Sequence, residues 1–116
     1  MSSDPLKIRI SHGKITAIGP GKADLLEAII KFGSISAAAK QMHMSYRRAW
    51  ELVDTMNRCF QEPLVITASG GSHGGGASVT ELGMHILKCY RDIIAKTHAS
   101  AEADMQAILN SLRQAD

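Results

Sequence analysis

Residues 33–57 read GSISAAAKQMHMSYRRAWELVDTMN, and this stretch predicts two short helices joined by a tight turn. Three consecutive alanines at 37–39 let the first helix lie close to its neighbour, and residues 42–44 supply the corner. Ser45 can cap the second helix by accepting a hydrogen bond from a backbone N–H of its first turn. Two helices in this arrangement form a helix-turn-helix.

The second helix opens with two arginines, Arg47 and Arg48. Helices that read the DNA major groove present their base-contacting side chains at this end. A guanidinium offers a bidentate fork, and an arginine–guanine contact discriminates against a wrong base by about 1–3 kcal/mol. The alternative is a solvated helix start, but two cations near a helix N-terminus are unfavourable in the field of the helix dipole. That placement favours contact of Arg47 and Arg48 with DNA.

Neighbouring polar side chains are candidates for contact with DNA phosphates. Groups at helix N-termini commonly bind phosphate, which makes Ser45 and Tyr46 candidates on the second helix and Ser34 and Ser36 candidates on the first. The alternative for Ser34 and Ser45 is capping alone. For Tyr46 the alternative is packing against the neighbouring helix.

An apolar stripe is expected to fix the second helix on the domain. Its members recur at spacings of three and four residues and are Ala49, Trp50, Val53, Met56 and Phe60. A tryptophan can also stack on a base, but its place in this stripe favours core packing. We therefore expect Trp50 to be buried and do not count it among the DNA-binding residues.

Short strands and a further helix precede the helix-turn-helix. Leu6–Ile10 and Lys14–Ile18 alternate apolar and polar residues, which predicts a β-hairpin. A helical apolar stripe follows over Lys22–Phe32, and Gly33 closes it at the position where a left-handed residue commonly ends a helix.

A second hairpin is expected after the helix-turn-helix. Its strands are Leu64–Ala68 and Ala77–Val79, around the glycine-dense loop Ser69–Gly76. The loop lacks the lysine followed by Ser or Thr that a nucleotide P-loop requires. We expect it to act as a wing whose glycines approach a sugar–phosphate backbone, with Ser72 and His73 as the hydrogen-bonding side chains at its tip. The alternative is a hairpin tip that makes no contact.

From Thr80 onward, apolar residues recur every three or four positions and predict one helix of about 30 residues. Such a helix spans roughly 45 Å, longer than the core of a small winged domain needs. Its far half should meet another chain, and two-fold homodimers are the commonest solution. A groove for a different protein is the alternative. The residues expected at the dimer interface are Leu82, Ile86, Tyr90, Ile93, Met105, Ile108 and Leu112.

Length and charge fit one domain with a basic, DNA-facing part. The chain has 116 residues and a formal net charge of +2, enough for one domain but not for two. Residues 1–80 carry nine Lys or Arg against six Asp or Glu, whereas residues 81–116 carry four against five. We therefore expect a winged helix-turn-helix DNA-binding domain at 1–80 and a long dimerisation helix at 81–116. The predicted class is mainly α with small β.

The sequence disfavours other classes of protein. No apolar run reaches the roughly 18–20 residues of a membrane span, and no signal peptide is evident. Cys59 and Cys89 lie in helical apolar patterns, which fits a reducing, cytoplasmic location. No cofactor is expected. No nucleophile–base pair or carboxylate pair stands out, so an enzyme is not expected. The chain has five histidines, His12, His43, His73, His85 and His98. We expect none of them to lie one helical turn from another histidine or a cysteine, so no metal site is expected.

The combination of residues 33–57, Leu64-Val65, the glycine loop and the T-x-x-G of Thr80 and Gly83 resembles the N-terminal winged-helix domain of ModE-type molybdate-responsive regulators. It is more distantly similar to the helix-turn-helix domain of LysR-type regulators. The resemblance implies a domain that binds DNA as a homodimer through the long helix after the wing. Regulators of this type carry C-terminal molybdate-binding domains, so no molybdate site is expected in this chain itself.

Two hypotheses for function follow. The first is a sequence-specific DNA-binding transcriptional regulator of the ModE type that acts as a homodimer on a near-palindromic operator in double-stranded DNA. The second is a protein-interaction module that pairs, through its long helix, with a separate ligand-sensing regulator.

Overall fold

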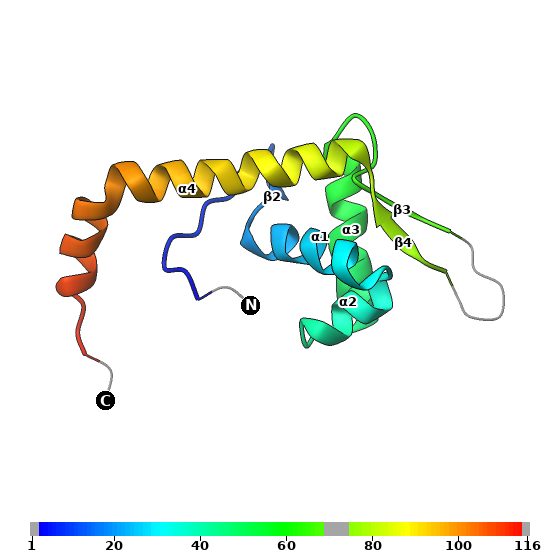
Figure 1. The fold of residues 1–116 in the computed structure, drawn as a ribbon, viewed down its shortest axis with the longest axis horizontal. Coiled ribbons are helices and arrows are strands. Elements are labelled where there is room, and N and C mark those ends of the chain that lie inside the picture. Colours follow the sequence, from blue (N-terminus) through cyan, green and yellow to red (C-terminus); the bar gives the residue numbers. More distant parts are fainter. Residues whose placement is uncertain (1–2, 69–74, 115–116) are drawn as a thin grey trace.

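The computed structural model describes residues 3–68 and 75–114. Along the chain its elements are β1 (Ile10–His12), β2 (Ile15–Ile18), α1 (Pro20–Phe32), α2 (Ile35–Gln41), α3 (Tyr46–Cys59), β3 (Val65–Thr67), β4 (Ala77–Val79) and α4 (Glu81–Asn110). Helices α1 to α3 pack together on one side of the first half of α4, with α1 in contact with it, and each pair of strands forms its own antiparallel hairpin (Figure 1). The predicted winged helix-turn-helix with an N-terminal hairpin and a long last helix is confirmed.

Helices α2 and α3 form the helix-turn-helix, and a serine side chain fixes the start of each. Ser34 Oγ accepts a hydrogen bond from the Ala37 N–H, and Ser45 Oγ accepts one from the Arg48 N–H, both over 3.0 Å. A cap of this kind stabilises a helix by about 1 kcal/mol. Between the helices, His43 adopts a left-handed backbone with φ of 56°, which lets the chain turn sharply at the predicted corner.

The core lies where the three short helices meet the first half of α4. Ala38 of α2 and Ala49 of α3 are fully buried, which agrees with the expectation that small residues let these helices approach closely. The larger side chains that fill the core are Leu25, Leu26, Ile29, Ile35, Val53, Met56, Leu64 and Tyr90.

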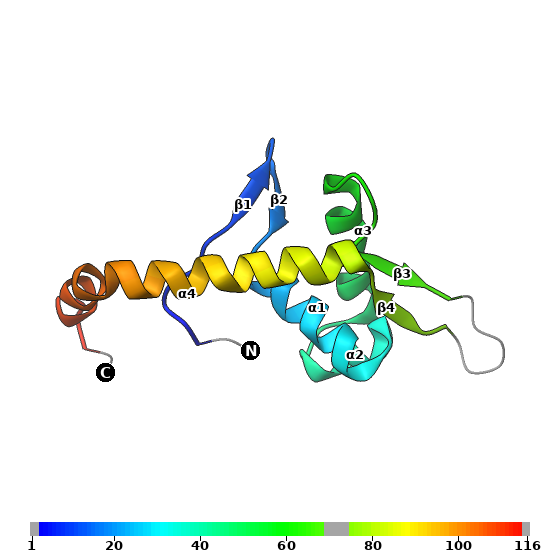
Figure 2. The ribbon, with the colours of Figure 1, turned by 45° about the horizontal axis from the view of Figure 1, so that its top comes forward.

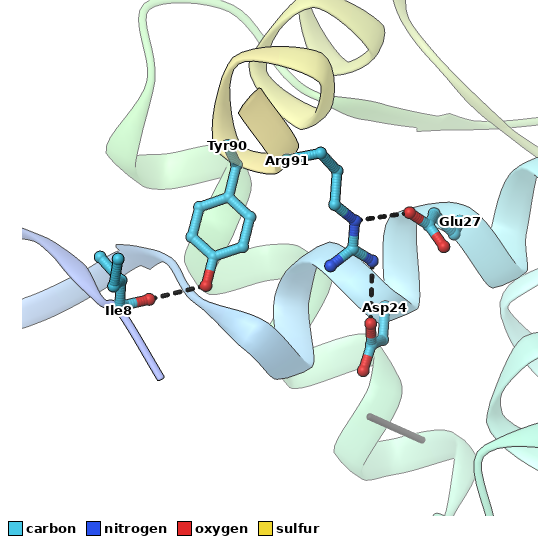
Figure 3. A network of polar contacts seen from close by, with 5 residues as sticks. All are labelled: Ile8, Asp24, Glu27, Tyr90 and Arg91. Carbon is cyan, nitrogen blue, oxygen red and sulfur yellow. Dashed lines mark hydrogen bonds and ion pairs between the residues drawn. The ribbon is translucent and has the colours of Figure 1, made fainter. Parts of the chain in front are cut away.

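Two neighbouring residues of α4 anchor it to the rest of the domain (Figure 3). The Tyr90 hydroxyl donates to the Ile8 carbonyl over 2.7 Å, and Arg91 forms ion pairs with Glu27 at 2.6 Å and Asp24 at 2.9 Å. Beyond Ile94, which still packs against the core, α4 extends away from the three shorter helices. The longest dimension of the whole structure is 54 Å. The radius of gyration is 16.2 Å, against about 13 Å for a compact chain of this length.

The first hairpin is shifted along the sequence from its expected position. The first strand begins at Ile10 rather than Leu6, and Gly13, with φ of 63°, forms the turn. Leu6 and Ile8 are half-buried in an extended segment beside α4. Their alternation therefore reflects packing of one side against a helix, and not strand pairing. Similarly, α1 starts at Pro20, two residues earlier than expected, because proline suits the first turn of a helix.

The second hairpin passes directly into α4 through the T-x-x-G segment. Thr80 Oγ1 accepts a hydrogen bond from the Gly83 N–H over 3.0 Å and donates to the Pro63 carbonyl over 2.8 Å. A Cβ at Gly83 would clash with the Leu64 carbonyl oxygen and lie 2.6 Å from Val79 Cγ1. Thr80 therefore caps α4, and Gly83 allows the helix to press against the base of the wing.

Candidate nucleic-acid interface

One side of α3 remains open to solvent along the helix. Ala49, Val53 and Met56 face the core, so residues on the opposite side project away from the domain. Arg47 lies there, and its side chain is 89% exposed. An α-helix of about 10–12 Å diameter fits the major groove of B-DNA, which is about 12 Å wide. The geometry of α3 therefore suits groove insertion.

The two arginines that start α3 face different surroundings. Arg47 Nε lies 3.2 Å from Glu51 Oε1 in an exposed ion pair, a contact that contributes at most about 1 kcal/mol and leaves the guanidinium easy to redirect. Arg48 instead lines a concavity beside the N-terminus of α1, together with Lys22 and Leu52. Both arginines are exposed, but only Arg48 lines this concavity.

The expectation that Trp50 is buried is wrong. Its side chain is 47% exposed, and Tyr46, one helical turn earlier, is 55% exposed. Ala49, Val53 and Met56 complete the inward stripe without it, and Trp50 lies about 100° around the helix from Ala49. Tyr46 and Trp50 therefore widen the exposed surface of α3 with two aromatic rings.

The start of α2 lies beside the wing. The Ala77 N–H donates to the Gly33 carbonyl over 2.9 Å, which joins β4 to the residue before Ser34. Ser34 is half-buried and acts as a cap, whereas Ser36 is exposed. These two serines and the wing therefore lie on the same side of α3. Ser72 and His73, expected at the wing tip, fall outside the described residues.

Sequence reasoning missed the contact that positions the wing against α3. Asn57 Oδ1 accepts hydrogen bonds from the Leu64 N–H at 2.8 Å and the Val65 N–H at 3.2 Å. Its Nδ2 donates to the Val65 carbonyl over 3.0 Å. The only sequence signal was an amide side chain in the helix that precedes the strand.

The residues predicted for the dimer interface divide into two groups. Tyr90 is 1% exposed and belongs to the chain's own core, so its assignment to the interface is wrong. Leu82 and Ile86 are partly buried against that same core. Farther along the chain, Ile93, Ile108 and Leu112 are 38%, 65% and 62% exposed, and Met105 is half-buried.

The expectation that no histidine lies one helical turn from a cysteine also needs a correction. His85 and Cys89 lie one turn apart on α4, with Nε2 and Sγ separated by 3.7 Å. The statement that no histidine has a cysteine at this spacing is therefore wrong. Across residues 3–68 and 75–114, no group of three or more His, Cys, Asp or Glu is arranged to hold a metal ion.

Comparison with known proteins gives two kinds of match. No family model matches the chain. The chain is 46% identical over 76 residues to the molybdenum transport protein ModE of Azotobacter vinelandii, a match that covers 66% of this chain and 28% of that protein. It is 38% identical over 82 residues to the DNA-binding transcriptional dual regulator ModE of Escherichia coli, covering 71% of this chain and 31% of that one. The chain is a homologue of ModE-type transcriptional regulators.

Solved structures extend this homology to the fold. A complex of the CbnR DNA-binding domain with DNA has a TM-score of 0.56 at 22% identity, over 76% of this chain and 95% of that chain. A LysR family transcriptional regulator has a TM-score of 0.55 at 16% identity, over 75% of this chain and 28% of that chain. The resemblance to ModE-type and LysR-type domains is therefore confirmed, and the proteins matched are regulators rather than enzymes.

The ModE homologues are longer than the segment they share with this chain, which spans 28% and 31% of the two described above. Within the part of the chain that the structure describes, no helix has the length and apolar character needed to cross a membrane.

Proposed function

We propose that this chain is a sequence-specific DNA-binding regulator of transcription that acts as a homodimer. The observation that carries the proposal is the open side of α3, where Arg47 is 89% exposed and Tyr46 and Trp50 are exposed beside it. In this proposal α3 enters the major groove and Arg47 reads a base edge. The DNA-binding names of the ModE homologue and the CbnR complex support the same partner.

Homodimerisation is the second part of the proposal. The far half of α4 carries exposed apolar residues at Ile93 and Ile108, and Leu112 just beyond the helix is exposed as well. Soluble oligomers are most often two-fold dimers, in which such a surface pairs with its own copy. Two α3 helices related by this axis would read half-sites about one turn of DNA, roughly 34 Å, apart. The expected operator is therefore a near-palindrome.

Titration of a fluorescent duplex tests the proposal. A near-palindromic site selected from a random pool and an unrelated duplex of the same length would be titrated with the wild-type chain and with Arg47→Ala. Loss of one arginine–base contact should weaken binding to the selected site by roughly 5- to 150-fold and leave the unrelated duplex little affected. Arg113→Ala, which removes one exposed positive charge beyond α4, is the matched control.

Equal affinity of the wild-type chain for the selected and unrelated duplexes would contradict sequence-specific binding. The alternative is an interaction module whose α4 pairs with a separate ligand-sensing regulator. That alternative predicts a chain that binds no duplex by itself and elutes as a monomer.

A further inference from the structure

A basic concavity lies on the side of α3 that faces the N-terminal hairpin. It has a volume of about 280 Å³, and its charged lining consists of Lys7, Arg9, Lys22 and Arg48, with no Asp or Glu among the lining residues. The four cations come from the segment before β1, from the first turn of α1 and from the first turn of α3. Four positive charges without a negative one create a site for an anion.

Lys22 forms the floor of this concavity and is the strongest sign that an anion belongs there. The residue is only 8% exposed, and its Nζ donates to the Thr16 carbonyl. Among the described residues it has no carboxylate partner, since no ion pair includes it. Burial, and to a lesser extent the nearby Arg48 guanidinium, lowers the pKa of Lys22. A buried cation without a counter-ion is unfavourable, and an anion seated in the concavity would relieve that cost.

The rim of the concavity is held in place by Gly19. A Cβ at Gly19 would lie 3.2 Å from Arg9 Cγ, so the absence of a side chain lets the aliphatic part of Arg9 lie against the backbone. Lys7 Nζ donates to the Asp4 backbone carbonyl over 3.0 Å. The Asp4 carboxylate, which does not line the concavity, lies close enough for the charge of Lys7 to contribute to its lowered pKa. The side chains of Lys7 and Arg9 are exposed and accessible to an external anion.

The position of the concavity identifies the kind of anion. The hairpin β1–β2 and the wing β3–β4 project on opposite sides of α3 (Figure 2), and Asn57 ties the wing to its own side. A helix in the major groove has one phosphate backbone on each side. When the wing and the start of α2 face one strand, the concavity therefore faces the other.

We propose that the concavity lined by Lys7, Arg9, Lys22 and Arg48 binds a DNA phosphate on the strand opposite the wing. The N-terminal hairpin then acts as a second clamp, so that the duplex is held on both sides of α3. This contact rests on the proposed function, because it requires α3 in the major groove. Phosphate contacts position a protein on DNA without reading its sequence.

The test is the salt dependence of binding by the double variant Lys7→Gln/Arg9→Gln, which removes two charges and retains much of each side chain's length. Affinity for a selected and for an unrelated duplex would be measured at several salt concentrations. Each lost phosphate contact should reduce the slope of log K against log[salt] by about 0.9. Binding to both duplexes should weaken by a similar factor. The matched control is Lys31→Gln/Lys96→Gln, which removes two charges from the far end of α1 and from α4.

The outcomes separate this proposal from the proposed function. A wild-type chain that binds neither duplex overturns both. If the wild-type chain binds the selected duplex and the Lys7/Arg9 variant has the same salt slope, only the proposed phosphate contact of the concavity is overturned. Unchanged thermal unfolding of the variant is required for the comparison to count in support. Thermal unfolding in millimolar inorganic phosphate provides a further test. If phosphate stabilises the wild-type chain but not the variant, and the variant binds DNA as the wild type does, the concavity binds a free oxyanion and not a DNA phosphate.

Discussion

The side chain of Asn57 binds the backbone of Val65 through both of its polar atoms: Nδ2 donates to the Val65 carbonyl over 3.0 Å, and Oδ1 accepts from the Val65 N–H over 3.2 Å. Through this pair, the last turns of α3 hold the strand that begins the wing. The groove-facing helix and the first strand of the wing are therefore joined by the side chain of Asn57, while Ala77 and Thr80 bind the wing to its other neighbours.

Replacement of Asn57 by leucine should loosen this connection. The substitution keeps a similar volume but leaves partly buried backbone groups at Leu64 and Val65 without their partners, a loss of about 1–3 kcal/mol in the free energy of unfolding. Urea denaturation measures it. Asn110→Leu, at the exposed end of α4, is the matched control and should be nearly neutral. If both variants unfold at the wild-type urea concentration, Asn57 does not hold the wing.

Gly83→Ala should destabilise the junction between the wing and α4. The new Cβ would clash with the Leu64 carbonyl and lie 2.6 Å from Val79 Cγ1, and overpacking of this kind costs about 1–3 kcal/mol. Gly21→Ala in the first turn of α1 is the control, because no atom lies within 4 Å of its added Cβ. That variant should gain about 0.4–1 kcal/mol by restricting the unfolded chain. Thermal unfolding of both variants would show opposite shifts, and shifts of the same sign would contradict the close contact.

Local patterns were sufficient to predict most of the fold. The caps at Ser34 and Ser45, the left-handed Gly33 and the period of α4 are each encoded within a few residues, and the structure has all of them. Contacts between distant segments were not predictable in this way. Tyr90 belongs to the same stripe as Ile93, yet its hydroxyl bonds to Ile8, 82 residues away, and its ring fills the core. Periodicity shows that a side chain is buried, but not whether the chain itself or a partner buries it.

The candidate site illustrates the same limit at the scale of one helix. Arg47 was predicted correctly to be exposed, because it opens a helix whose apolar residues lie elsewhere. Trp50 was assigned to the core by its hydrophobicity, although it lies beside the stripe. The concavity around Lys22 depends on how the hairpin packs against α3, and no spacing within the sequence encodes that arrangement.

Trp50→Ala should affect DNA binding far more than stability. Removal of a core tryptophan typically costs about 3–5 kcal/mol, but this side chain is 47% exposed, so the free energy of unfolding should fall by well under that amount. Met56→Ala is the control on the inner face of the same helix, where the side chain is fully buried, and should lose about 2–5 kcal/mol. Chemical denaturation and duplex titration of both variants separate the two roles. If the Trp50 variant is as unstable as the Met56 variant, the Trp50 side chain is part of the core.

Ile108→Glu should separate the proposed dimer. Ile108 is 65% exposed on the part of α4 that extends from the domain, and a charge at the centre of an apolar seam is not matched across a two-fold axis. Sedimentation analysis of the wild-type chain should give twice the monomer mass of 12.5 kDa, and the variant should approach the monomer value. Gln106→Glu adds the same charge at a neighbouring exposed position and should remain dimeric. A wild-type chain that sediments as a monomer at micromolar concentration would remove the basis for this part of the proposal.

Acid should weaken the contact between Asp4 and α4, while the Tyr90–Ile8 hydrogen bond still holds the rest of that segment. His98 Nε2 lies 2.7 Å from Asp4 Oδ2, and this hydrogen bond, followed by one from the Leu6 N–H, lowers the pKa of Asp4 below its usual 3.8. An aspartate whose pKa is lowered by folding stabilises the folded state above pH 3.8, and that contribution is lost as the pH falls through the folded-state pKa. The carboxyl carbon of Asp4, followed by NMR, should titrate below 3.8 in the wild-type chain and nearer to 3.8 in His98→Ala. His12→Ala, on the exposed strand β1, should leave that titration unchanged. Identical Asp4 titrations in all three chains would mean that His98 does not hold this segment.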